Sequence, residues 1–298
     1  IFGASCMMKP VPPTRSCLMS EKLKNQSHQN HNKADSDTGK PVPFVGKGFQ
    51  PKSRQWIGYL VFVIIIFLIE LGTTSGVISS LTLPKPSDVL ETMIELYHSG
   101  LLFKHLVPSI SRLILGSLIG ISLGITIGTL IGLFSYIRSG LVPVIAAIFP
   151  IPKIALLPLF VIWFGIGEGS KYALIALGSF TPTVVATYGA VDNVDRTLIR
   201  MGQSFGLSWT SIVRKIVLPG AMPGILSGLR ISLAISIILL VAAEMLGAEF
   251  GIGAYILEAG SLYDLERLFT GVAILSALGV TVSVLIGMLE QKVLKWRV

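Results

Sequence analysis

Long apolar runs constrain this chain more than any other feature of its sequence. The runs 56–78 and 106–134 each exceed the roughly 20 residues that a helix needs to cross the hydrocarbon core of a bilayer. Because lipid offers the backbone no hydrogen-bonding partner, each such run is expected to be a helix. With 52% hydrophobic and only 13% charged residues, the chain is predicted to be an all-α, polytopic membrane protein.

We predict about six transmembrane helices in residues 56–298, preceded by a polar tail. The spans are expected at 56–78, 106–134, 141–164, 172–191, 225–246 and 269–289. Residues 1–55 have too little apolar content to fold and are predicted to be a disordered cytoplasmic tail, in which Met19 is an alternative start to Ile1. Between the first two spans, Ser87 is expected to be the N-cap of a surface helix whose apolar face holds Val89, Leu90, Met93, Ile94 and Tyr97.

The distribution of charge predicts the orientation of the chain and argues against nucleic acid as a partner. The net charge is +8, but the basic residues flank the apolar spans, as lysine and arginine do beside membranes. Most of them lie on the side that holds the N-terminus, the C-terminus and residues 192–224. The positive-inside rule therefore places both termini and this loop in the cytoplasm. The sequence offers no catalytic constellation, no metal cluster and no phosphate-binding loop. The segment GKGFQPKS resembles such a loop, but Pro51 replaces its second glycine.

Two spans carry local signals about packing. The second has glycine at every fourth residue from Gly116 to Gly132, a spacing that lets helix backbones approach closely. We expect this seam to pack within the chain, with a dimer interface as the alternative. The third span is interrupted by Pro150, Pro152 and Pro158, and broken helices at membrane depth are tolerated where protein covers them or where they line a cavity. Pro158 is therefore a candidate for a translocation path.

Four ionisable residues lie within or at the edge of the spans. A charged side chain is costly in lipid, so each of these residues is a candidate for a functional role. Glu70 and Arg112 are expected to extend to the headgroup region, although Arg112 is also a candidate path residue. Glu244 has a gate or path role as an open alternative. Lys153 falls near the midplane. There it either is held by the carbonyls freed by the prolines, or by a glutamate, and stabilises the broken helix, or it gives a cavity a positive potential that favours anions.

The loop at about 192–224 is long and half polar. VDRTLIRMGQSF is predicted to be a helix that stops at Gly206, and Ser208 is expected to cap a second, short amphipathic helix that ends at Leu218 and Pro219. Such a shape suits a groove on a partner protein, or else the membrane surface. The stripe of the second helix is formed by Trp209, Ile212, Val213 and Ile216.

This loop resembles the cytoplasmic coupling loop of ATP-binding-cassette importer permeases. Their pattern has Glu-Ala-Ala, a glycine a few residues later and a hydrophobic stretch ending in Leu-Pro. This chain has Gly206 and IVLPGAMPGILSGLRISL, but Arg200-Met201-Gly202 in place of Glu-Ala-Ala. IPKIALLPLFVIWFGIGEGSKYALIALGSFTPT and AAEMLGAEFGIGAYI are similar to the nitrate/sulfonate/taurine permease subfamily, and the likeness covers about residues 57–298.

The resemblance implies a MetI-like permease subunit of a type I importer that is not itself an enzyme. It further implies a homodimer in the inner membrane, two ATPase subunits that dock on the coupling loops and themselves bind ATP and Mg²⁺, and a periplasmic or lipid-anchored substrate-binding protein. The cargo would be a small, anionic solute such as nitrate, a sulfonate or taurine. A neutral thiamine-precursor-like pyrimidine, and an ATP-independent carrier or channel, are the alternatives.

Overall fold

The computed structural model describes residues 55–79 and 82–295, and within those ranges every regular element is a helix. The predicted disordered tail, 1–55, lies outside the described residues except for its last one. Contacts divide the chain into a unit that ends at Leu60 and a unit from Val61 to Val298. The described part of the first unit is only the start of α2, Gln55–Thr74. The second unit contains every later element and is the one that carries the candidate sites.

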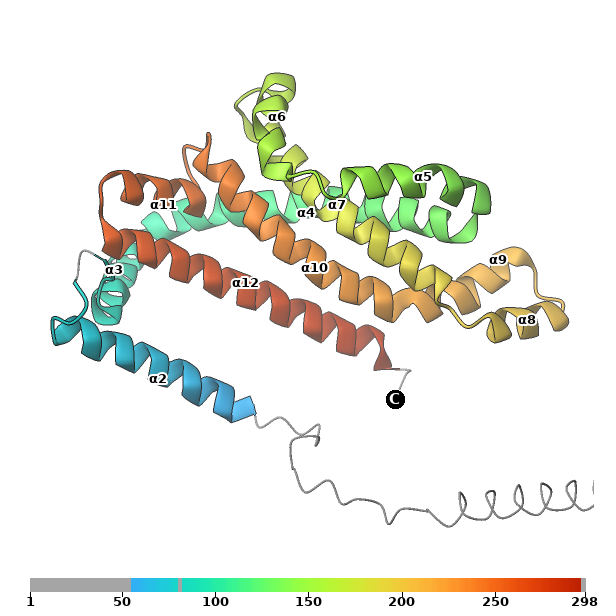
Figure 1. Cartoon of the computed structure of the whole chain (residues 1–298), viewed down its shortest axis with the longest axis horizontal. Helices are drawn as coiled ribbons and strands as arrows, with labels where there is room; N and C mark the ends of the chain where they lie inside the picture. The colour runs from blue at the N-terminus through green and yellow to red at the C-terminus, as the bar shows by residue number, and fades with distance from the viewer. Residues whose placement is uncertain (1–54, 80–81, 296–298) are drawn as a thin grey trace, which may run out of the picture. The chain divides into compact units, whose positions relative to one another are not determined.

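Three long helices form the core of this second unit: α4 (Leu101–Leu133), α7 (Glu168–Asp192) and α10 (Leu218–Met245). Figure 1 shows them side by side, with α12 (Leu265–Val293) along α10. Side chains from the three core helices meet in one buried cluster, in which Ile175 and Leu240 are fully buried. The outer surface of the unit stays apolar, as a lipid-facing surface must, and α12 leaves Val280 64% exposed.

The glycine seam packs within the chain, as predicted. All five glycines lie on the face of α4 that contacts α7. A Cβ placed on Gly124 would lie 2.7 Å from the Cβ of Thr183. One placed on Gly128 would lie 2.6 Å from the Cβ of Thr187. Real side chains do not approach so closely, so the two backbones can stay at this separation only while the seam remains glycine.

Replacing Gly124 by leucine is therefore expected to prevent the packing of α4 on α7. Overpacking of a well-packed core costs about 1–3 kcal/mol, and here the obstruction includes the backbone of the neighbouring helix. We expect the amount of folded protein recovered in detergent to fall at least several-fold. Gly140→Leu is the matched control, because a Cβ on Gly140 has no neighbour within 4 Å. Equal recovery of the two variants would show that the seam does not depend on glycine.

The predicted number of about six spans is reached if one bent pair of helices is counted as a single span. Among the described residues, five helices are long and apolar enough to cross a membrane. The predicted third span, 141–164, is instead two helices: α5 (Ser135–Ile148) and a segment made of the 3₁₀ turn η2 (Lys153–Leu156) and α6 (Leu157–Phe164). They meet at an angle of 89°. Pro150 and Pro152 cause the break, because neither can donate a backbone hydrogen bond to the preceding turn.

The predicted helix end at Leu218 and Pro219 is wrong. The short helix α9 (Trp209–Ile212) continues through the π-helical turn η3 (Val213–Val217) into α10, and together they form one helix of 37 residues. A proline obstructs the carbonyl four residues before it. Here the wide turn ends at Val217, directly before α10, and Pro219 lies in the first turn of α10. The local widening accommodates the proline without ending the helix.

The surface helix α3 (Pro86–His98) forms, but the prediction of its N-cap is wrong. Its N-cap is Lys85 rather than Ser87, because Pro86 already fits the first helical turn. The carboxylate of Glu70, expected to extend to the headgroups, accepts hydrogen bonds from the Ser87 N–H and hydroxyl at 3.1 and 2.9 Å. On the predicted apolar face, Val89 and Met93 are half-buried, and the other three residues are exposed: Leu90, Ile94 and Tyr97.

Candidate functional site

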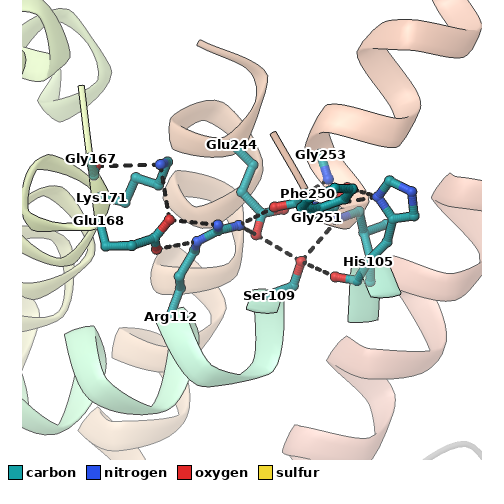
Figure 2. A network of polar contacts seen from close by, with 11 residues as sticks. His105, Ser109, Arg112, Gly167, Glu168, Lys171, Glu244, Phe250, Gly251 and Gly253 are labelled. Carbon is teal, nitrogen blue, oxygen red and sulfur yellow. Dashed lines mark hydrogen bonds and ion pairs between the residues drawn. The ribbon is translucent and has the colours of Figure 1, made fainter. Parts of the chain in front are cut away.

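A cluster of charged side chains links three helices where α7 begins and α10 ends (Figure 2). Arg112, from α4, forms a two-point ion pair with Glu168, with Nε 2.6 Å from Oε2 and Nη2 2.7 Å from Oε1. Its Nη1 donates to Glu244 Oε1 at 2.8 Å and to the carbonyl oxygen of Phe250 at 2.7 Å. Lys171 Nζ donates to Glu168 Oε1 at 3.2 Å. Two cations therefore face two carboxylates, and the cluster is neutral overall.

Burial makes this charge balance necessary. The side chains of Arg112 and Glu244 are 6% and 0% exposed, and a buried charge without a partner is strongly destabilising. The expectation that Arg112 extends to the headgroups is therefore wrong. Spacing along α4 alone does not reveal that the packing of α7 and α10 brings a carboxylate to each side of the guanidinium.

Glu244 also fixes the start of α11 (Ile252–Ser261). Its Oε2 accepts the N–H of Gly253 at 2.8 Å, while Ser109 Oγ donates to its Oε1 at 2.7 Å and accepts the N–H of Ile252 at 2.9 Å. Gly251, with φ of +153°, brings the chain so close that a Cβ there would lie 2.5 Å from Glu244 Cδ. The free N–H groups of the first turn of α11 are thus satisfied by two other helices.

The cluster leaves little bonding capacity for a ligand. Four of the five N–H groups of Arg112 already donate to protein acceptors, and both oxygens of Glu244 already accept. An open cleft of about 350 Å³ lies beside Arg112, Glu168 and Phe250. Path roles for Arg112 and Glu244 stay predictions, and these bonds favour positioning over direct contact with solute. Within the described ranges, no group of three or more His, Cys, Asp or Glu side chains could hold a metal ion.

At the opposite ends of α7 and α10, residues 193–217 form the predicted helix, corner and second helix. α8 (Arg196–Ser204) begins at Asp195, whose carboxylate accepts the N–H of Thr197 at 2.8 Å, a bond that holds the pKa of Asp195 below its ordinary value. Gly206 has φ of +70°, and the N–H of Leu207 bonds the carbonyl of Gly202, which closes α8 with a left-handed turn. Ser208 caps α9 as predicted, accepting the N–H of Ser211.

The apolar stripe predicted on the second helix mostly faces the helix bundle. Ile212 is 6% exposed and packs in a core cluster with Val191 and Val217, and Ile216 packs against the same cluster. Val213 is half-buried, and Trp209 is 54% exposed with its ring beside Phe134. This stripe fastens the loop to the helix bundle, because it faces the end of α7.

The exposed apolar side chains lie on α8 and its corner instead. Leu198, Met201 and Phe205 are 49%, 51% and 80% exposed. Their spacing of three and four residues places them on one face of the helix, a signal that the sequence already contained. The three residues that replace Glu-Ala-Ala also lie on α8: Arg200 and Met201 are exposed, whereas Gly202 is buried against Ile216. We call Leu198, Met201 and Phe205 the α8 stripe.

Lys153 lies at the break between α5 and α6 and is half-buried. Its Nζ donates to the carbonyl oxygen of Phe149 at 2.7 Å and lies 5.2 Å from the centre of the Phe149 ring. The expected bond to a carbonyl near the prolines is therefore present. Pro158 does not kink a helix interior, because it falls in the first turn of α6, where proline is tolerated.

Comparison with known proteins identifies the family. Residues 116–295 match the family model described as "Binding-protein-dependent transport system inner membrane component". The chain belongs to this family. The permease is 37% identical over 247 residues to the "Putative aliphatic sulfonates transport permease protein SsuC" of Bacillus subtilis, a match that covers 83% of this chain and 90% of that protein. It is 34% identical to the "Taurine transport system permease protein TauC" of Escherichia coli, over 75% of this chain and 83% of that protein.

A solved structure supports the same fold for the permease. A chain of the MetNI methionine ABC transporter, in an inward-facing conformation, aligns with a TM-score of 0.57 at 21% identity. The alignment covers 65% of this chain and 96% of that chain. The predicted all-α, MetI-like fold is confirmed, and the protein is a multi-pass inner-membrane permease subunit of an ABC importer. A permease of this kind is not itself an enzyme.

Proposed function

We propose that this permease carries a small sulfonate anion into the cytoplasm, driven by ATP hydrolysis in separate subunits. The observation that carries the proposal is the similarity, along 75% or more of the chain, to relatives named for aliphatic sulfonates and for taurine. These two kinds of solute share a sulfonate group. ATP and Mg²⁺ would bind to the ATPase subunits rather than to this chain.

The proposed assembly contains two copies of the permease, two ATPase subunits and a periplasmic or lipid-anchored substrate-binding protein. The described part of one chain has a single loop of the α8–α9 type, so two copies related by a two-fold axis would present the two loops that two ATPases need. Both termini and this loop would lie in the cytoplasm, where the positive-inside rule places Arg138, Arg196, Arg200, Arg214 and Lys215.

The α8 stripe is the proposed contact with the ATPase. Apolar side chains that stand exposed on a short helix, beside arginines, suit a groove on a partner protein. The predicted stripe on the second helix would instead hold the loop in place. Under this proposal Gly206 determines the direction in which α8 leaves the bundle, because a left-handed residue sets the turn.

Gly206 supplies the test. A Cβ at this position has no neighbour within 4 Å, so a substitution acts through backbone preference rather than through a clash. Valine disfavours the left-handed conformation, at a cost on the order of 1–2 kcal/mol, whereas asparagine adopts it readily. With the cognate ATPase and binding protein in liposomes, we expect ATP-dependent uptake of labelled taurine or ethanesulfonate. Gly206→Val should reduce uptake at least tenfold, and Gly206→Asn should retain most of it.

The same assay separates the alternatives. Uptake by wild type without ATP would indicate a carrier or channel, and would overturn the proposal. If the importer takes up a pyrimidine in an ATP-dependent manner but neither taurine nor ethanesulfonate, the assignment as an importer stands and the proposed sulfonate cargo is rejected. If Gly206→Val imports as well as Gly206→Asn, the corner does not direct docking.

A further inference from the structure

The break between α5 and α6 lies at the mid-depth of the helix bundle. Before the break, Ile145 packs in one buried cluster with Val184, in the second half of α7. After it, Leu157 packs with Leu174, in the first half of α7. Because α7 is long enough to cross the membrane, residues 149–152 are level with its middle.

The backbone of the break is exposed in the single chain. All four residues of 149–152 are exposed, and two of them are prolines that leave carbonyl groups without a helical partner. Non-helical backbone at membrane depth does not face lipid, since each unsatisfied polar group there costs several kcal/mol. The exposed side of the break must therefore face water or another protein chain.

Lys153 adds a charge at the same depth. Three other cations in the long helices are ion-paired, Arg112 and Lys171 within the charged cluster described above and Arg230 with Glu290 at 3.0 Å. Within residues 55–79 and 82–295, no carboxylate is ion-paired with Lys153, and its ammonium donates only to the Phe149 carbonyl. Two of its three N–H groups remain available for an anion.

We propose that the 149–153 break lines an aqueous passage and that Lys153 gives this passage the positive potential that admits anions. The inference deepens the proposed import function and rests on it, because the passage is taken to carry the sulfonate. Lys153 acts here as a specificity-determining residue: a single positive charge, held in place by the Phe149 carbonyl, attracts a monoanion and repels a cation.

Paired thiol reagents measure this potential directly. Cys6 and Cys17 are replaced by serine, and Ile151→Cys places a thiol at the exposed break. The importer complex, in membrane vesicles, is treated with the anionic sulfonatoethyl and the cationic trimethylammonioethyl methanethiosulfonates. A change in the reactivity of the thiol itself affects both rates equally, so the ratio of the two rates reports only the local electrostatic potential. Val280→Cys, on the outward face of α12, sets the baseline for a lipid-facing position.

We expect Ile151→Cys to react well above the Val280→Cys baseline. Adding Lys153→Met should lower the anion-to-cation rate ratio about tenfold, since removal of one charge acts oppositely on the two reagents, and Lys153→Arg should preserve the ratio. A baseline rate at Ile151→Cys, or a ratio unchanged by Lys153→Met, would overturn the proposal. Labelling requires neither ATP nor substrate, so an absence of sulfonate uptake in wild type would count against the proposed cargo and not against the charged passage.

Discussion

Arg112→Met is expected to destabilise the permease more than any other single substitution in the charged cluster formed by Arg112, Glu168, Lys171 and Glu244. Methionine fills much of the same space but leaves Glu244, whose side chain is 0% exposed, without its cation. Removing one partner of a buried ion pair costs about 3–5 kcal/mol. Thermal unfolding of the solubilised importer, followed by size-exclusion chromatography, should show a clearly lower midpoint and loss of folded protein at growth temperature.

Three variants test whether the charge is the cause. Arg112→Met combined with Glu244→Gln removes both charges of the pair, and the amide oxygen can still accept the N–H of Gly253, so the double variant should be more stable than Arg112→Met. Glu244→Gln alone should cost less, because Arg112 keeps Glu168. Arg230→Met removes an exposed ion pair with Glu290 and should cost at most about 1 kcal/mol. If the double variant is as unstable as Arg112→Met, lost packing rather than lost charge explains the effect.

Phe205→Asp is expected to abolish coupling to the ATPase while leaving the permease folded. The side chain is 80% exposed, so the chain itself gains little from it. An aromatic anchor at the centre of an interface is worth about 2–4 kcal/mol, which corresponds to an affinity loss of roughly 30- to 1,000-fold. Co-purification of the ATPase should be lost, and ATP-dependent uptake should fall at least tenfold.

Tyr263→Asp is the control for this prediction. Tyr263 is 90% exposed but lies just after α11, at the other end of the helix bundle. It should retain both the ATPase and uptake. Normal co-purification of the ATPase with Phe205→Asp would show that the α8 stripe is not the docking surface.

The helices themselves could be predicted from the sequence, because lipid leaves the backbone no alternative to helical hydrogen bonding. The glycine seam was predictable for a similar reason: its spacing of four places every glycine on one face. The left-handed corner at Gly206 and the cap at Ser208 followed from local preferences that act within a few residues.

The errors concern features that depend on distant residues or on competing local rules. Arg112 appeared able to reach the headgroups because Glu168 and Glu244 are far away in sequence. Pro219 was expected to end a helix, and nothing in the local sequence reveals the π-helical turn that accommodates it. On α9, Trp209 and Ile212 form an amphipathic stripe, but periodicity does not tell whether such a stripe faces a partner or the core of the same chain. In fact Ile212 faces the core, and the exposed face belongs to α8.

The continuous helix formed by α9, η3 and α10 has a mechanical consequence. A helix of 37 residues is about 55 Å long, and one end carries the corner loop while the other carries Glu244. A tilt of about 10° displaces one end relative to the other by roughly 10 Å over that length. Because Glu244 holds the first turn of α11, a displacement imposed on the end that carries the corner loop would move α11 at the opposite end of the helix. Under the proposed docking, the helix would act as a lever that joins the ATPase contact at one end to α11 at the other, without an interruption between them.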